Sequence, residues 1–171
     1  MLKRRSPLLI FTFLAILFLQ ACSGNDFHLR KNVDLPIDYQ KIKLENISYE
    51  NNFVKIFEEI LEESGGKLVS DSVSTSTTIR INNFREGKRI IAFTKDRKAR
   101  EFLLSLKFDY TIKPTKKRVL SNKNYRINLD RVFIYDANFA LGKEEEETKI
   151  KKNLYREAAR LILLKLQYNK D

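Results

Sequence analysis

The sequence is poor in the residues from which most active sites are built. Its 171 residues include one cysteine, Cys22, and one histidine, His28. One cysteine excludes a disulfide framework and a multi-cysteine zinc site, and one histidine cannot build a metal cluster. His28 also has no nucleophile nearby that it would serve as a general base. Glycine-rich phosphate loops and the HExxH and GxSxG motifs are missing as well. We therefore expect a protein that is not an enzyme and has no metal and no cofactor.

Long hydrophobic runs are missing too. The apolar run from Leu8 to Leu19 is about a dozen residues long, whereas a membrane-spanning helix needs roughly 20. The run follows the basic start MLKRRS and precedes a small residue, Ala21, and this order is typical of a secretory signal peptide. The sequence therefore predicts a signal peptide over residues 1–21.

The end of this segment, Leu19-Gln20-Ala21-Cys22, resembles the lipobox of bacterial lipoproteins. The resemblance implies that the thiol of Cys22 carries diacylglycerol, that the chain is cut before it, and that the new amino terminus carries an N-acyl chain. The mature chain would have 171 − 21 = 150 residues. Two or more acyl chains give stable membrane anchoring, where one chain gives marginal binding. Ser23 after the cysteine, in place of aspartate, implies sorting to the outer membrane.

Positive charge exceeds negative charge. The formal net charge is +11, and loss of Lys3, Arg4 and Arg5 with the signal peptide would leave 11 − 3 = +8. Inside a cell this excess suggests nucleic acid, but beyond a signal peptide the abundant polyanions are lipopolysaccharide, anionic phospholipid and cell-wall polymers. We therefore expect an anionic envelope partner and no nucleic acid. With 43% hydrophobic and 32% charged residues, one globular domain is expected over residues 38–171, after a lipidated tether over residues 22–37.

Two segments have helical periodicity. The first places apolar residues on one face of a helix that Asn51 or Asn52 would cap and Gly65-Gly66 would end. Its apolar face is formed by Phe53, Ile56, Phe57, Ile60 and Leu61. The second runs from about Lys143 to Tyr168, and its start carries Glu144 to Glu147, where negative charge favours a helix. Its predicted inward row is Ile150, Leu154, Ala158, Leu161 and Lys165, widened by Tyr155, Ala159, Ile162 and Leu166.

Strand signals lie between and before these helices. Alternation is clearest from Phe102 to Ile112, and it is also present in Tyr39 to Ile47 and from Tyr125 onward. Thr78 to Phe93 is a less regular strand, in which Glu86-Gly87-Lys88 is either a bulge or a turn, and we expect a bulge. The segment TKDRKA is expected to form a hairpin tip. The order β-α-β-β-β-α predicts an α+β two-layer sandwich, with two helices on one face of a mostly antiparallel four-stranded sheet.

Several short motifs resemble one known family. Phe27-His28-Leu29-Arg30 follows the lipidated cysteine, Thr94-Lys95-Asp96-Arg97 occupies the hairpin tip, and Ala140-Leu141-Gly142-Lys143 precedes the last helix, which carries Tyr155-Arg156-Glu157-Ala158-Ala159. In this order and spacing the chain resembles the LptE family of lipopolysaccharide-assembly lipoproteins over nearly the whole mature chain. It departs from the family in the extra residues SGND before Phe27, and in ending soon after the last helix.

The resemblance implies a function and a partner. LptE proteins sit in the lumen of the LptD β-barrel, plug it, assist its assembly, and bind lipopolysaccharide during its delivery to the cell surface. It implies a heterodimer with an LptD-like barrel, held at the periplasmic side of the outer membrane by the lipid on Cys22. Phosphates of lipopolysaccharide suit Lys and Arg donors, and the family's basic positions match Lys95 and Lys143, with Arg97 and Lys98 in support.

Other interpretations fit the same residues. The chain could be a generic outer-membrane lipoprotein, an adaptor for another envelope or cell-wall complex, with solubilising lysines. An envelope hydrolase would require a concave pocket with converging carboxylates. A second basic cluster, Lys113, Lys116, Lys117 and Arg118, faces either a barrel wall or solvent, and the sequence does not decide between them.

Overall fold

The structure, a computed structural model, describes residues 35–69, 76–114, 123–134 and 143–168. The chain divides into two units, residues 1–31 and 32–171, and every described residue belongs to the second. The predicted signal peptide, Cys22 and most of the predicted tether lie outside the described residues. Within the second unit, Leu35 is already part of the core.

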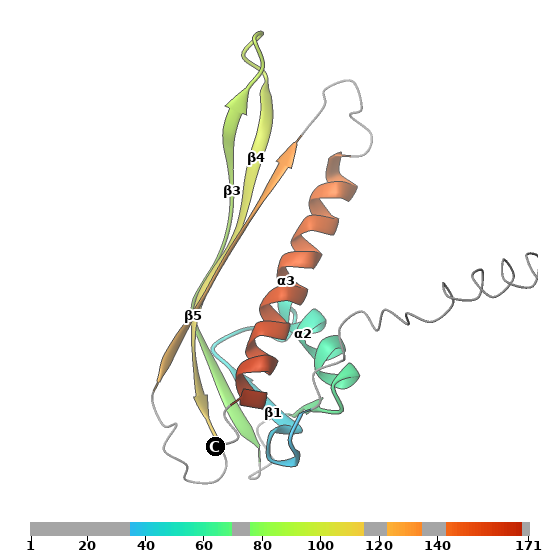
Figure 1. The fold of residues 1–171 in the computed structure, drawn as a ribbon, viewed down its shortest axis with the longest axis vertical. Helices are drawn as coiled ribbons and strands as arrows, with labels where there is room; N and C mark the ends of the chain where they lie inside the picture. Colours follow the sequence, from blue (N-terminus) through green and yellow to red (C-terminus); the bar gives the residue numbers. More distant parts are fainter. Residues whose placement is uncertain (1–34, 70–75, 115–122, 135–142, 169–171) are drawn as a thin grey trace, which may run out of the picture. The chain divides into compact units, whose positions relative to one another are not determined.

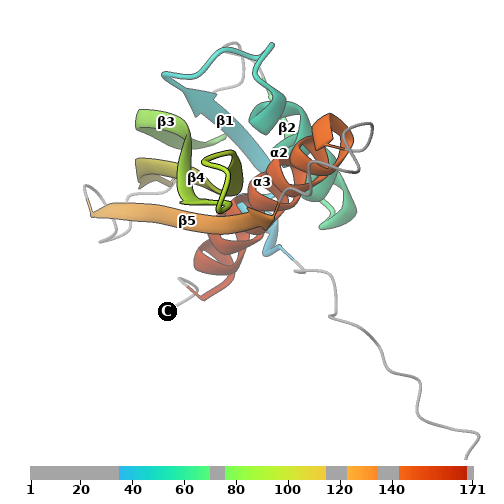
Figure 2. The same cartoon turned by 90° about the horizontal axis from the view of Figure 1, so that it is seen from above.

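The described elements follow the predicted order, with one further strand (Figure 1). They are a 3-10 turn η2 (Ile37–Tyr39), β1 (Lys41–Glu45), α2 (Asn52–Glu63), β2 (Lys67–Leu68), β3 (Thr77–Phe93), β4 (Ala99–Lys113), β5 (Asn124–Ile134) and α3 (Lys143–Tyr168). Figure 2 shows α2 and α3 on the same face of the sheet. The prediction of an α+β sandwich with two helices on one face is therefore confirmed.

The strand count and the pairing differ from the prediction. The sheet has five strands in the order β2-β1-β3-β4-β5. It is mixed, because β1 pairs in parallel with both β2 and β3, while β3-β4 and β4-β5 are antiparallel. The sequence did not predict β2 because two residues are too few to show a period. The turn after α2 brings β2 beside β1, where the Lys67 amide donates to the Gln40 carbonyl at 2.7 Å.

The first helix forms as predicted. Asn51 is the cap, since its side-chain oxygen accepts the amide of Phe53 at 2.8 Å. Gly65 then takes a φ of +77°, a left-handed conformation that ends a helix readily at glycine. The five predicted apolar residues are all buried. Phe53 is fully buried, and its ring contacts those of Phe57, Phe84, Phe108 and Tyr155 at centroid distances of 5.3–6.2 Å.

The alternation predicted for β4 is confirmed. From Phe102 to Ile112 every second side chain is buried against the helices, and the residues between them face the other side of the sheet, here called the outer face. β5 follows β4 without interruption, from Glu101 opposite Ile134 to Thr111 opposite Asn124.

The bulge in β3 lies elsewhere than predicted. Glu86-Gly87-Lys88 is regular strand, paired with Leu106, Ser105 and Leu104, so the predicted bulge there is wrong. The first register shift lies between the pairs Asn82–Asp109 and Arg85–Lys107, where Asn83 is the extra residue, and two further shifts follow between Ile90 and Phe93. Asn83 has a φ of +55°, which asparagine tolerates better than most residues. Gly87 instead allows β3 and β4 to approach each other closely, because a Cβ atom at this position would lie 2.6 Å from the Ser105 Oγ.

The last helix has the predicted bounds, but its buried face is rotated slightly. Leu161, assigned to the inward row, is 40% exposed, and Lys165 is half-buried. Leu163, which the prediction omitted, is fully buried. Both helices pack on the same face of the sheet, so α3 contacts α2 as well as β4 and β5. Because of the additional contact with α2, the buried stripe of α3 is wider than predicted and rotated around the helix axis.

Candidate functional site

The predicted basic tip is an exposed hairpin turn. The Thr94 amide donates to the Lys98 carbonyl at 2.8 Å and the Arg97 amide to the Thr94 carbonyl at 3.0 Å, which closes the turn. Arg97 takes a φ of +59°. The side chains of Lys95, Arg97 and Lys98 are all exposed. Residues 94–100 hold four cations and one aspartate, so their formal charge is 4 − 1 = +3.

Lys143, which the resemblance places in the loop before the last helix, is the first residue of α3. The hairpin tip and the start of α3 lie toward the same end of the sheet, and the tip extends beyond the helix (Figure 1). Three of the four predicted ligand residues therefore share one turn, and Lys143 begins a separate element. Glu144, Glu145 and Glu146 follow it in the first helical turn, so this helix start presents mixed charge to an anion.

The second basic cluster has only one described member. Lys113 ends β4 and is exposed, and Lys116, Lys117 and Arg118 lie outside the described residues. Near Lys113, the Tyr110 and Tyr125 rings stack at 5.2 Å, and Lys123 and Lys165 each lie over the Tyr125 ring. Burial, with a smaller contribution from Tyr125, raises the pKa of Tyr110 to about 12.

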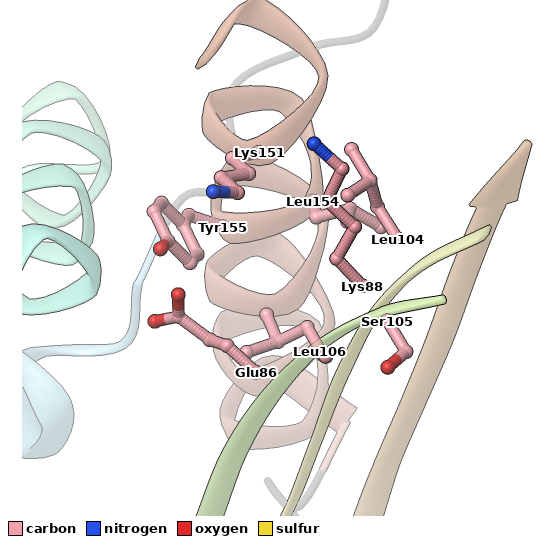
Figure 3. Close-up of a pocket in the computed structure, with 9 residues that line it drawn as sticks. Glu86, Lys88, Leu104, Ser105, Leu106, Lys151, Leu154 and Tyr155 are labelled. Atoms are coloured by element: carbon pink, nitrogen blue, oxygen red, sulfur yellow. The ribbon is translucent and has the colours of Figure 1, made fainter. Parts of the chain in front are cut away.

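A groove separates α3 from β3 and β4 (Figure 3). It has a volume of about 240 Å³, an apolar floor of Leu104, Leu106 and Leu154, and Lys88 and Lys151 at its rim. Ligand pockets generally measure about 300–1,000 Å³. Both lysines already pair with the half-buried carboxylate of Glu147. The Lys88–Glu147 pair links the hairpin to the helix across the groove, and the groove is therefore less suited to a ligand.

Two groups at this groove, Glu147 and Tyr155, have shifted pKa values. Hydrogen bonds from Lys88 and then Lys151 lower the pKa of Glu147. Burial, and then the hydrogen bond with Glu86, raise the pKa of Tyr155, whose hydroxyl faces the Glu86 carboxylate (Figure 3). The sequence did not predict the contacts of Lys88 with Glu147 and of Glu86 with Tyr155, because the Asn83 bulge changes which residues of β3 face the helix. Correcting the alternation for that bulge would have placed Glu86 and Lys88 on the helix side.

The outer face of the sheet changes character along its length. At the end near β1 it carries charged pairs, with Arg80 on Glu45 and Arg126 on Asp109, each at 2.8 Å. Hydrogen bonds from Arg126 and then Asn83 lower the pKa of Asp109. At the hairpin end the outer face carries exposed apolar side chains as well as charged ones, since Leu103 pairs with the 52%-exposed Val132 on one side and with Arg89 on the other.

Within the described ranges, no three His, Cys, Asp or Glu residues are grouped so that they could hold a metal ion. Of the helices in that part of the chain, none combines the length and the apolar character needed to cross a membrane. The described surface carries a basic turn at residues 94–98, exposed apolar side chains on the outer face beside it, and charged pairs further along.

Solved structures of three bacterial lipoproteins have a similar fold. They are rare lipoprotein B from Shewanella oneidensis (TM-score 0.61, 17% identity, 76% of this chain and 96% of that chain), a minor lipoprotein from Acinetobacter baumannii (0.59, 17%, 79% and 96%) and an uncharacterized lipoprotein B from Nitrosomonas europaea (0.61, 21%, 80% and 87%). At these identities the likeness establishes the fold alone.

Sequence comparison carries the family assignment. No curated protein matches the chain. The family model LptE, described as Lipopolysaccharide-assembly, matches residues 39–166, which is most of the chain and includes every described strand and nearly all of α3. The protein is therefore a member of the LptE family of lipopolysaccharide-assembly lipoproteins.

Proposed function

We propose that this protein is the lipoprotein subunit of an outer-membrane lipopolysaccharide translocon. It plugs an LptD-like β-barrel, assists the assembly of that barrel, and binds lipopolysaccharide during delivery to the cell surface. The observation that carries the proposal is the family match over residues 39–166. In this role the chain binds and positions its partners and catalyses no reaction.

The surface of the domain supports the role of a plug. Barrel interiors are polar, so a domain held inside one needs polar and charged side chains on the faces that meet the wall. The outer face meets this requirement over most of its length, through the Asp109–Arg126 and Glu45–Arg80 pairs and the Lys107–Asp130 contact. On the helix side, Arg131 of β5 pairs with Glu157 of α3.

The basic turn supports lipopolysaccharide binding. Ionised donors form the strongest hydrogen bonds to phosphate oxygens. Lys95, Arg97 and Lys98 present three such donors from one exposed turn, and the turn projects beyond α3 (Figure 1). We assign the phosphate contacts to Lys95 and Lys143, with Arg97 and Lys98 in support. Because three glutamates follow Lys143, we expect it to contribute less than Lys95.

The anchor completes the proposal. Residues 1–21 act as a signal peptide, and Cys22 carries a diacylglycerol group and an N-acyl chain that hold the protein at the periplasmic side of the outer membrane. In this setting residues 22–37 are a tether between the lipid and the domain over residues 38–171. The basic start, the short apolar run and the lipobox support this assignment.

Two experiments test the partner and the anchor. Affinity purification from detergent-solubilised envelopes is expected to recover a large β-barrel protein with this chain. Recovery of cell-wall components without a barrel would favour an adaptor lipoprotein instead. Cys22→Ala is expected to abolish metabolic labelling with fatty acid and to leave the precursor uncut at this position. Continued labelling would remove the lipobox assignment.

A charge-reversal experiment tests the ligand residues. The Lys95→Asp/Lys143→Asp double variant is expected to bind lipopolysaccharide at least about 10-fold more weakly, with an unchanged circular dichroism spectrum, because it loses two charge-assisted contacts. Lys113→Asp/Lys123→Asp is the matched control. It reverses two exposed cations at the end of the sheet away from the basic turn, Lys113 at the end of β4 and Lys123 just before β5. Equal affinity of the two double variants would show that binding follows net charge and not these positions.

A further inference from the structure

The hairpin end of the sheet leaves large apolar side chains in water. Of the described large hydrophobic residues that are exposed, five lie at this end: Ile90, Ile91 and Phe93 on β3, and Val132 and Ile134 on β5. Their exposed fractions run from 40% to 61%. Contiguous exposed apolar surface in a folded protein generally marks a binding surface.

Strand pairing places part of this surface on one face. Leu103 of β4 lies between Arg89 and Val132, and Glu101 lies between Ala92 and Ile134. Opposite residues in an antiparallel sheet share a face, and Leu103 alternates with the buried Phe102 and Leu104. Leu103, Val132 and Ile134 therefore form an apolar patch on the outer face, here called the outer patch, on the side away from the helices.

The outer patch adjoins the basic turn. β4 connects Leu103 of the patch to residues 94–98, whose cations are exposed. Arg89 of β3 is paired with Leu103 and so lies beside the patch. One end of the sheet therefore presents hydrocarbon surface and several positive charges side by side. The ligand that complements both is an anionic amphiphile, with phosphates for the cations and alkyl chains for the apolar side chains.

We infer that the outer patch holds acyl chains of the lipopolysaccharide molecule whose phosphates meet the basic turn. This inference rests on the proposed function and adds a second contact region to it. A barrel wall is a poorer occupant, because barrel lumens are polar, and the rest of the outer face already has the charged pairs that suit such a wall. Acyl chains, in contrast, gain free energy in proportion to the apolar area that they remove from water.

The Val132→Thr/Ile134→Thr double variant tests the inference. Threonine keeps the β-branched shape that strands favour, while a hydroxyl replaces a methyl group of Val132 and the ethyl group of Ile134. Leu161→Thr is the matched control, an exposed leucine on α3 that is not part of the outer patch. The full-length proteins, held in nanodiscs of zwitterionic lipid, are titrated with intact lipopolysaccharide and with its completely deacylated form. Thermal unfolding of each variant establishes that the fold is kept.

The expected result is selective. The double variant should bind intact lipopolysaccharide on the order of 10-fold more weakly and should bind the deacylated form as the wild type does. Unchanged affinity for intact lipopolysaccharide would overturn the inference, and so would an equal loss for both forms. Loss of barrel co-purification with unchanged lipopolysaccharide binding would assign the patch to the barrel. If the wild type binds neither form, the proposed ligand itself is wrong and the inference fails with it.

Discussion

The two ends of the sheet use the same strands for different purposes. At the end covered by both helices, β3 and β4 bury alternate side chains such as Ile81 and Leu106, and the outer face carries charged pairs. At the hairpin end, β3 is exposed on both faces from Arg85 onward apart from Ala92. An isolated hairpin is marginally stable in water, so the hairpin end depends on the covered end for its stability and is free to serve binding.

The contrast indicates where substitutions should affect folding and where they should affect binding. Stability scales with the apolar area removed from water, and that area lies in the cluster that joins α2, α3 and the covered end. The hairpin end adds little to it beyond the Phe102 and Phe133 rings, which pack in a tilted arrangement with centroids 6.0 Å apart. Substitutions of one chemical kind at the two ends therefore separate the two roles.

The largest difference is expected for an introduced charge. Leu106→Asp places an unpaired carboxylate at a side chain that is 1% exposed, at a cost of several kcal/mol, and we expect the domain to unfold. Val132→Asp, on the half-exposed outer patch, should leave the midpoint of urea denaturation nearly unchanged. A folded Leu106→Asp protein with a wild-type midpoint would show that the assigned core does not determine stability.

A smaller difference is expected for two phenylalanines. Phe53→Ala removes a fully buried ring that contacts four aromatic neighbours, and such truncations cost about 3–5 kcal/mol. Phe93→Ala removes a ring that is 61% exposed, and surface changes generally stay within about 0.5 kcal/mol. Chemical denaturation followed by circular dichroism measures both free energies, and similar losses would mean that the two ends share one core.

The smallest effect is expected where an ion pair links the two layers. The pKa of Glu147 is lowered in the folded protein by Lys88 and Lys151, so its contribution to stability is present above the ordinary glutamate pKa of about 4.3 and is lost as the pH falls through the lowered folded value. Because both lysines are partly exposed, the contribution at pH 7 should stay below about 1 kcal/mol. Glu147→Gln should remove it.

The measurement compares free energies of unfolding at pH 7 and at pH 3. At pH 7 the wild type should have a larger free energy of unfolding than Glu147→Gln, and this difference should be smaller at pH 3. Glu145→Gln, an exposed glutamate of the same helix, serves as the control and should show a smaller difference. A Glu147 difference that does not change with pH would show that the ion pair contributes nothing measurable.

The sequence predicts those parts of the fold that depend on a period or a cap. The α2 face, its Asn51 cap and the β4 alternation are local properties, and the structure has them as predicted. The formation of β2 and the burial of Leu163 depend on which elements pack together, and no local sequence pattern contains that information. The tip residues Lys95, Arg97 and Lys98 were located correctly in a turn, whereas the Lys88–Glu147 contact joins residues 59 positions apart and needed the structure.

The extra residue at Asn83 determines which side of the sheet the β3 residues from Phe84 to Ile90 face, up to the next register shift between Ile90 and Ala92. Before this point odd-numbered residues such as Ile79 and Ile81 face the helices, and after it even-numbered residues such as Glu86 and Lys88 do. Deleting Asn83 would exchange the two sides, turning Lys88 away from Glu147 and Arg89 toward α3. Viable changes of length in this strand should therefore come in steps of two, and a shift of one would detach the hairpin from the helix in a single event.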